Sequence, residues 1–228
     1  MSATDSDEVS DGTAIGDRRA QARGRESKRY QARRREFIDA AAHEFIEHGY
    51  ETTAVGDIAD RVGSDRATFY YYFDGKEQLL EIFEEVVAQI TEANLNAAED
   101  IVSMEESARD KLRLIVRTIL ASFVENYPVV YVYIAEELHK VRWKKDGFAP
   151  QILSQNRAIE AIVADILDEA IEQGDFRSDL ITKVATHGLF GMINWTYRWL
   201  NPDGDFGSRE LSDMFFTLFV DGMAVRSN

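Results

Sequence analysis

The segment from residue 37 to residue 83, FIDAAAHEFIEHGYETTAVGDIADRVGSDRATFYYYFDGKEQLLEIF, contains three successive helical patterns. Apolar residues recur in it at spacings of three and four, which is the period of one face of a helix. Gly49 and Gly63 end the first two patterns, and Asp65 is placed to cap a third, very short helix. Two short helices joined by a tight glycine turn and preceded by a longer helix are typical of a helix-turn-helix.

The third helical pattern separates an inner face from an outer face. Phe69 and Phe73 lie four residues apart, so both are predicted to face the core. Three side chains are left nearer the outside: Arg66, Tyr70 and Tyr71. After a turn of Asp and Gly, a long fourth helix is predicted to begin at Lys76.

This segment closely resembles the DNA-binding domain of the TetR/AcrR family of transcriptional regulators. The resemblance is carried by small, aromatic and glycine positions, namely Ala40, Ala41, Phe45, Gly49, Tyr50, Thr53, Val55, Ile58, Ala59, Gly63, Thr68, Phe69, Tyr70, Tyr72, Phe73, Lys76, Glu77, Leu79 and Leu80. It implies that the third helix is a recognition helix, which lies in the major groove of double-stranded DNA.

The resemblance also implies which side chains contact DNA. Arg66 suits guanine, because its guanidinium can donate to O6 and N7 together. Ala67 and Thr68 would approach bases or backbone closely, whereas the tyrosines and Lys76 would contact phosphates. The full set of predicted DNA contacts is Thr53, Arg66, Ala67, Thr68, Tyr70, Tyr71 and Lys76, with Arg33 and Arg34 from the basic segment before the motif.

Three positions depart from the family's pattern. Ala54 stands where the family generally has a Thr or Ser cap, so Thr53 is expected to cap the second helix one residue early. Gly56 stands where many members carry a long polar side chain on the DNA side, and Ser64 replaces a usual apolar residue. These changes argue against direct base contacts from the second helix.

Charge is distributed unevenly along the chain. The net charge of −15 by itself argues against a nucleic-acid-binding protein. Residues 18–35, however, hold nine bases against one acid, so the acid excess lies elsewhere. That excess, with 7 Lys beside 19 Arg, resembles the composition of proteins from salt-loving (halophilic) organisms. We expect a disordered arm over residues 1–27, the DNA-binding domain over 28–76 and a second domain over 77–228.

The second domain is expected to bind an effector and to form a homodimer. Its last two helices, predicted over residues 179–199 with Asp179 as cap and over 209–225, combine small residues with large apolar ones. In the family, such helices form a four-helix bundle with the same pair from a second subunit. The predicted dimer interface comprises Gly188, Gly191, Phe215, Phe219 and Gly222.

The resemblance further implies an effector pocket between the middle helices, one of which is predicted over residues 129–140. The predicted lining is aromatic and basic, and consists of Tyr127, Tyr131, Tyr133, Arg142, Trp143, Lys145, Phe148, Trp195, Tyr197, Arg198 and Trp199. The run GMINWTYRWLNPDG, residues 191–204, resembles family members that respond to fatty acyl-CoA. An acyl-CoA or another small apolar effector is therefore expected.

Other classes of function find little support in the sequence. The chain has no Cys and no HExxH pair, so neither a metal nor a cofactor is expected. It has three Pro and no long apolar run, which favours an all-α, cytoplasmic protein without a membrane span. The main hypothesis is a ligand-responsive repressor that binds a palindromic operator as a homodimer and is not an enzyme. A small-molecule-binding α-helical enzyme and a non-specific nucleoid protein are the alternatives.

Overall fold

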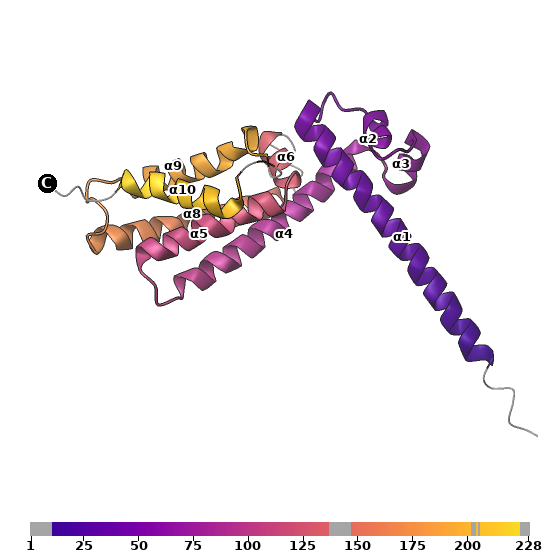
Figure 1. Ribbon diagram of the computed structural model, residues 1–228, viewed down its shortest axis with the longest axis horizontal. Helices are drawn as coiled ribbons and strands as arrows, with labels where there is room; N and C mark the ends of the chain where they lie inside the picture. The colour runs from indigo at the N-terminus through magenta and orange to yellow at the C-terminus, as the bar shows by residue number, and fades with distance from the viewer. Residues whose placement is uncertain (1–10, 137–146, 202–203, 205, 224–228) are drawn as a thin grey trace, which may run out of the picture.

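A computed structural model describes residues 11–136, 147–201, 204 and 206–223, with side chains from residue 27 onward. All regular secondary structure in these residues is helical, which confirms the predicted all-α class. Figure 1 shows a small N-terminal domain crossed by one long helix, and an elongated bundle of helices on the other side of that helix.

Three helices form the N-terminal domain: α1 (Asp11–His48), α2 (Val55–Arg61) and α3 (Arg66–Tyr72). Gly49 has a φ of 87°, which lets the chain turn sharply after α1. Gly63 has a φ of 62° and makes the equivalent turn between α2 and α3. The helix-turn-helix predicted from the spacing is therefore confirmed.

The first helix begins earlier than the sequence predicted. Residues 1–27 were expected to be a disordered arm, whereas α1 begins at Asp11. Residues 11–27 contain no proline and hold several Ala and Arg, which are good helix formers, so the helix can continue toward the N-terminus. Residues 1–10 of the predicted arm lie outside the described residues. In Figure 1 this part of α1 extends past α2 and α3 as a single helix.

The fourth helix, α4 (Lys76–Val102), leaves the N-terminal domain and runs into the bundle. The bundle also contains α5 (Ala108–Glu125), α6 (Val129–Ala135), α8 (Ala149–Glu172), α9 (Thr182–Asn194), the short 3-10 helix η1 (Trp195–Arg198) and α10 (Ser208–Asp221). α4 packs along α5 and α8, and α10 packs along α5.

Two apolar cores stabilise the molecule. The first fills the N-terminal domain around five buried phenylalanines, Phe37, Phe45, Phe69, Phe73 and Phe83. It continues into the bundle, because Val132 and Tyr133 of α6 and Ile152 of α8 belong to the same cluster. The second core lies between α4, α5, α8, α9 and α10. α4 contributes to both cores and therefore joins the two parts.

The last helices differ from their predictions at the ends. Asp179 was expected to cap α9, but the N-cap of α9 is Ile181. Asp179 instead forms an ion pair with Arg177 at 3.3 Å. The α-helix ends at Asn194 and continues as η1, rather than running to residue 199. The predicted helices over 129–140 and 209–225 include residues 137–140 and 224–225, which lie outside the described residues.

Within the described part of the chain, no single helix is both long and apolar enough to cross a membrane. α5 and α6 reach that length and composition when taken together, but they are bent by 100° where they meet. Both contribute buried residues to the cores, among them Leu112, Ile119 and Val132.

Candidate nucleic-acid interface

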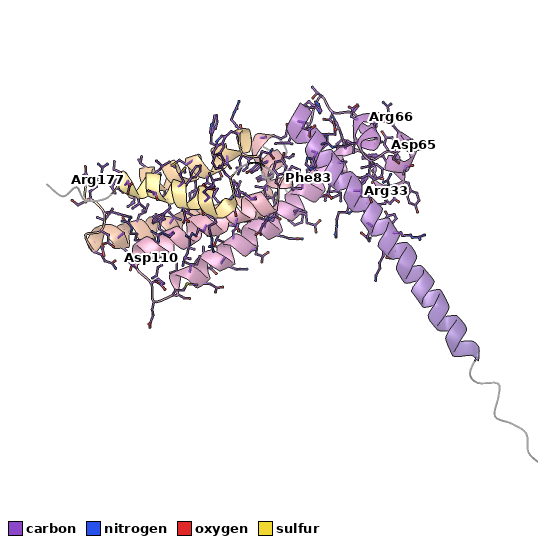
Figure 2. All side chains as sticks on the ribbon, in the orientation of Figure 1. Arg33, Asp65, Arg66, Phe83, Asp110 and Arg177 are labelled. Carbon is purple, nitrogen blue, oxygen red and sulfur yellow. The ribbon has the colours of Figure 1, made fainter. Side chains whose placement is uncertain are left out.

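The third helix begins at a capped N-terminus. The carboxylate of Asp65 accepts a hydrogen bond of 2.7 Å from the backbone N–H of Thr68. This bond stabilises the ionised carboxylate and therefore holds the pKa of Asp65 below its ordinary value. The cap predicted for Asp65 is confirmed, and it determines where α3 begins (Figure 2).

One face of α3 points into the solvent. Arg66 and Ala67 are exposed, Thr68 is half-buried, and the tyrosines that follow are 56% exposed at Tyr70 and 71% exposed at Tyr71. Phe69 and Phe73 lie in the core, as their spacing predicted. Figure 2 shows Arg66 at the opposite end of the molecule from Asp110 and Arg177. These side chains form one protruding surface, and their contacts with DNA stay predictions.

The first helix, α1, packs against α3 and against the turn that precedes it. The ring of Tyr30 lies 6.0 Å from that of Tyr71, an edge-on contact between α1 and α3. Arg33 donates a hydrogen bond of 3.1 Å to the carbonyl of Val62, in the turn after α2. Arg34 places its guanidinium 5.2 Å from the centre of a core phenylalanine ring. Both arginines are half-buried, and their contacts with DNA stay predictions.

An ion-pair network attaches α2 to α1. Arg61 donates to Glu44 and to Glu47, each at 2.7 Å. These bonds raise the pKa of the Arg61 guanidinium and lower the pKa of Glu47. Glu44, Glu47 and His48 also lie within 4.8 Å of one another, which is a metal-like grouping. Because Arg61 already pairs with both carboxylates, the grouping is explained as an anchor between helices.

Two predicted DNA contacts have structural partners instead. Thr53 is 2% exposed, and its hydroxyl donates to the carbonyl of Gly49 at 2.8 Å. Its expected role as cap is wrong, because Ala54 is the N-cap of α2. Its DNA contact stays a prediction, and the structure gives its hydroxyl a partner within the protein. The ammonium of Lys76 donates to three carbonyls of the loop after α1, those of Tyr50 at 2.8 Å, Glu51 at 3.3 Å and Thr53 at 3.1 Å. A phosphate contact by Lys76 stays a prediction.

A cavity of about 330 Å³ lies within the bundle, lined by residues of α4, α5, α6, α8 and α9. Apolar side chains make up much of the lining, including Val87, Ile90 and Phe123. The polar part comprises Thr91, Asn94, Tyr133, Asn156, Arg157, Glu160 and Asn194. Burial raises the pKa of Tyr133 to about 12, so its phenol keeps its proton at neutral pH.

Of the predicted effector residues that the structure describes, Tyr133 lines this cavity and the others do not. Tyr131 is fully buried, and its ring packs 5.1 Å from that of Tyr127. Trp195 and Trp199 are exposed on and beside η1, where Arg198 stacks on Trp195 at 4.9 Å. Arg142, Trp143 and Lys145 lie outside the described residues. Core packing accounts for Tyr131, and the surface of η1 accounts for Trp195 and Trp199, whereas the part of the whole set in effector binding stays a prediction.

A hydrogen bond across 86 positions connects the cavity to the N-terminal domain. Tyr133 and Ile134 of α6 line the cavity, and Glu136 is the C-cap of this helix. The Glu136 carboxylate accepts a hydrogen bond of 2.9 Å from the backbone N–H of Tyr50. The loop after α1 is therefore held by α6 on one side and by Lys76 of α4 on the other.

The predicted dimer residues lie on an open face of α9 and α10. Gly188 and Gly191 are exposed, and a Cβ built on either would meet no other atom within 4 Å. Gly222 is exposed at the end of α10, and Phe215 and Phe219 are half-buried beside it. Large apolar side chains are exposed on the same two helices, namely Val184, Met214 and Leu218. Contact with a second subunit stays a prediction at this point.

Comparison with family models gives two matches in adjacent parts of the chain. Residues 37–82 match the model of bacterial regulatory proteins of the tetR family, and this range covers the helix-turn-helix. Residues 105–223 match the model of the tetracyclin repressor-like C-terminal domain, which takes in more than half of the chain. Both halves of the fold thus match one family.

Individual proteins agree with these matches. The chain is 26% identical over 196 residues to the HTH-type transcriptional repressor KstR2 of Rhodococcus jostii, covering 86% of this chain and 93% of that protein. The crystal structure of the probable transcriptional regulatory protein RHA5900 is 25% identical, with a TM-score of 0.72 over 85% of this chain and 100% of that one. AibR in complex with isovaleryl coenzyme A and operator DNA shares the fold at 20% identity, with a TM-score of 0.61 over 82% and 97% of the two chains. The chain belongs to the TetR family of bacterial regulatory proteins.

Proposed function

We propose that this protein is a homodimeric, ligand-responsive transcriptional repressor that binds a palindromic operator in the cytoplasm. The observation that carries the proposal is the exposed face of α3, where Arg66, Tyr70 and Tyr71 protrude from a capped helix inside a tetR-family domain. Repression is inferred from the relative in Rhodococcus jostii, which is a transcriptional repressor. We assign no catalytic residue and no cofactor.

The open face of α9 and α10 supports the homodimer. Its exposed apolar side chains include Val184 and Leu218, and its glycines allow close approach of a second helix pair. A two-fold dimer would present two copies of α3 to two half-sites about one DNA turn apart. The same symmetry makes a palindromic operator the expected target.

The cavity in the bundle is the proposed effector site. Its apolar lining suits the body of a small apolar molecule, and Arg157 and the asparagines suit a polar or anionic end. An acyl-CoA is one effector of that chemistry, and AibR, which shares the fold, binds isovaleryl coenzyme A. Tyr133 is the described member of the aromatic set predicted from the sequence that belongs to this proposed site.

The proposed coupling runs through α4 and α6. Both helices line the cavity, and both hold the loop around Tyr50, through Lys76 and through Glu136. An effector that binds one arrangement of these helices more tightly than another would shift the population of the dimer between states of different DNA affinity.

Fluorescence anisotropy with DNA from upstream of the protein's own gene tests the central claim. Wild type should bind this DNA tightly and a scrambled duplex of equal length weakly. Arg66→Ala should lose about 10- to 100-fold in affinity, the range expected for one bidentate base contact. Arg177→Ala, at the far end of the bundle in Figure 2, is the matched control and should bind as wild type. Equal binding of both duplexes would favour the nucleoid alternative, and no binding at any salt would overturn the proposal.

A thermal-shift series tests the effector class. A ligand at 100 times its Kd stabilises the folded state by about 2.7 kcal/mol, which is readily measured. We expect stabilisation by an acyl-CoA or a free fatty acid, and a smaller effect in Phe123→Trp, which would fill part of the cavity. No stabilisation by either ligand would reject this class of effector while leaving the DNA-binding proposal standing.

A further inference from the structure

The side chain of Arg66 lies against a glycine of the neighbouring helix. A Cβ built on Gly56 of α2 would stand 2.8 Å from Nη2 of Arg66, 2.9 Å from Nε and 3.3 Å from Cζ. Real Cβ atoms do not approach other heavy atoms so closely. The guanidinium can therefore lie across α2 at this point because residue 56 has no side chain.

The backbone gives no reason of its own for a glycine here. Gly49 and Gly63 have positive φ values, which other residues rarely adopt, but Gly56 is not in that conformation. Gly56 is the second residue of α2, and glycine is a poorer helix former than alanine. The contact with Arg66 is thus the structural feature that distinguishes position 56 from the rest of α2.

No polar partner among the described residues holds Arg66 in this direction. Asp65 beside it is occupied as the cap of α3, through its bond to Thr68. The direction of the guanidinium is therefore limited by its steric contact with α2. An arginine that must donate to guanine O6 and N7 together depends on direction, because a sideways displacement breaks one of the two parallel bonds.

We propose that Gly56 is a specificity-determining position, because it leaves the space through which Arg66 reaches its base pair. A side chain at position 56 would push the guanidinium aside without harming the fold, since the atoms in contact are the far end of a flexible side chain. The inference rests on the proposed DNA-binding function. It adds a residue of α2 that acts through Arg66 and makes no base contact of its own.

A double-mutant cycle on the operator tests the proposal. Gly56→Ala, Arg66→Ala and the double variant are compared with wild type by fluorescence anisotropy, on the native operator and on operators with each base pair of one half-site changed in turn. Gly56→Ala should bind the native operator about 10-fold or more weakly and lose its preference at the same base pair as Arg66→Ala. In the Arg66→Ala background, the same substitution should change affinity by less than about twofold.

Thermal unfolding separates this effect from damage to the fold. Gly56→Ala should unfold at the wild-type temperature or above it, because alanine favours the helix. Gly207→Ala is the matched control: a Cβ there meets nothing within 4 Å, and its operator affinity should equal that of wild type.

Three outcomes would overturn the assignment. Wild-type affinity and base preference in Gly56→Ala would show that the contact does not direct Arg66. An equal loss in the presence and absence of the Arg66 side chain would show that Gly56 acts through α2 alone. If wild type prefers no DNA sequence, the proposed function fails together with the inference. If wild type binds its operator specifically and Gly56→Ala binds it equally well, only the inference is rejected.

Discussion

Replacing Lys76 with methionine tests whether this lysine holds the protein together or contacts DNA. Methionine keeps an apolar stem near the ring of Tyr50, over which the ammonium lies at 4.4 Å. It removes the charge and all three donors to the loop carbonyls, at 2.8, 3.1 and 3.3 Å. The half-buried carbonyls of Tyr50 and Thr53 would then lose their charged donor.

The expected loss can be worked from these bonds. A hydrogen bond to a charged group contributes about 1.5–3 kcal/mol, and the bond at 3.3 Å is the weakest of the three. Water would replace part of the lost contacts at the partly exposed loop, so we expect a total of about 2–4 kcal/mol. For a chain of this size that corresponds to a fall in Tm of about 4–16 °C.

Thermal unfolding followed by circular dichroism, together with operator binding at several salt concentrations, is the assay. If the ammonium serves the loop, Lys76→Met should lower the Tm while the slope of log affinity against log salt stays at the wild-type value. Lys183→Met, an exposed lysine on α9, is the control for loss of one charge and should unfold as wild type. An unchanged Tm with a slope reduced by about 0.9 would refute this reasoning, because that is the mark of one lost phosphate contact.

Four further outcomes follow from the fold. Asp65→Asn should unfold at a lower temperature than wild type at neutral pH. The folded pKa of Asp65 lies below 3.8, so the extra stability of wild type should disappear as the pH falls through that lower pKa. Thermal unfolding of both proteins from pH 2 to pH 7 measures this. Leu218→Glu puts a charge on an apolar side chain that is 63% exposed, and should convert a dimer to a folded monomer in light scattering after gel filtration; an unchanged mass would exclude this face. Deleting residues 1–27 removes four arginines of the basic segment and should reduce the salt slope of DNA binding, whereas an identical slope would show that this segment does not contact DNA. The acidic composition predicts that helical circular dichroism persists in molar KCl, and loss of the signal there would refute adaptation to salt.

The helix-turn-helix was predictable because its signals are local. Gly63 and Asp65 stand next to the boundaries that they determine, so the predicted ends of α2 and α3 agree with the structure within a residue. Thr53 was wrongly predicted to cap α2, because the capping hydrogen bond at Ala54 is donated by its backbone and needs no polar side chain at the cap position. The backbone N–H of Ala54 donates to the carboxylate of Asp57 at 2.7 Å, and no side-chain acceptor at the cap position is needed.

The cavity was not predictable in the same way. Five helices contribute to its lining, and residues such as Asn94, Asn156 and Asn194 come from three of them. Their positions become neighbours only after the bundle has packed, so periodicity along one helix gives no sign of them. The aromatic residues predicted from the sequence to line a pocket were separated by packing, because Tyr133 lines the cavity whereas Tyr131 packs in the core. The inward direction of Lys76 was hidden for a similar reason, since a sequence shows its charge but not the carbonyls that surround it.

The anchoring of α2 to α1 has a consequence for how such a regulator can respond. Arg61 is bound to Glu44 and Glu47, and Arg33 is bound to the turn at Val62, so these contacts attach α2 and the turn before α3 to α1. We therefore expect a conformational change in the bundle to tilt or shift these three helices together, without rearranging the surface of α3. On that expectation, a small molecule would change the affinity for every operator by a similar factor and would leave the preference for particular base pairs unchanged.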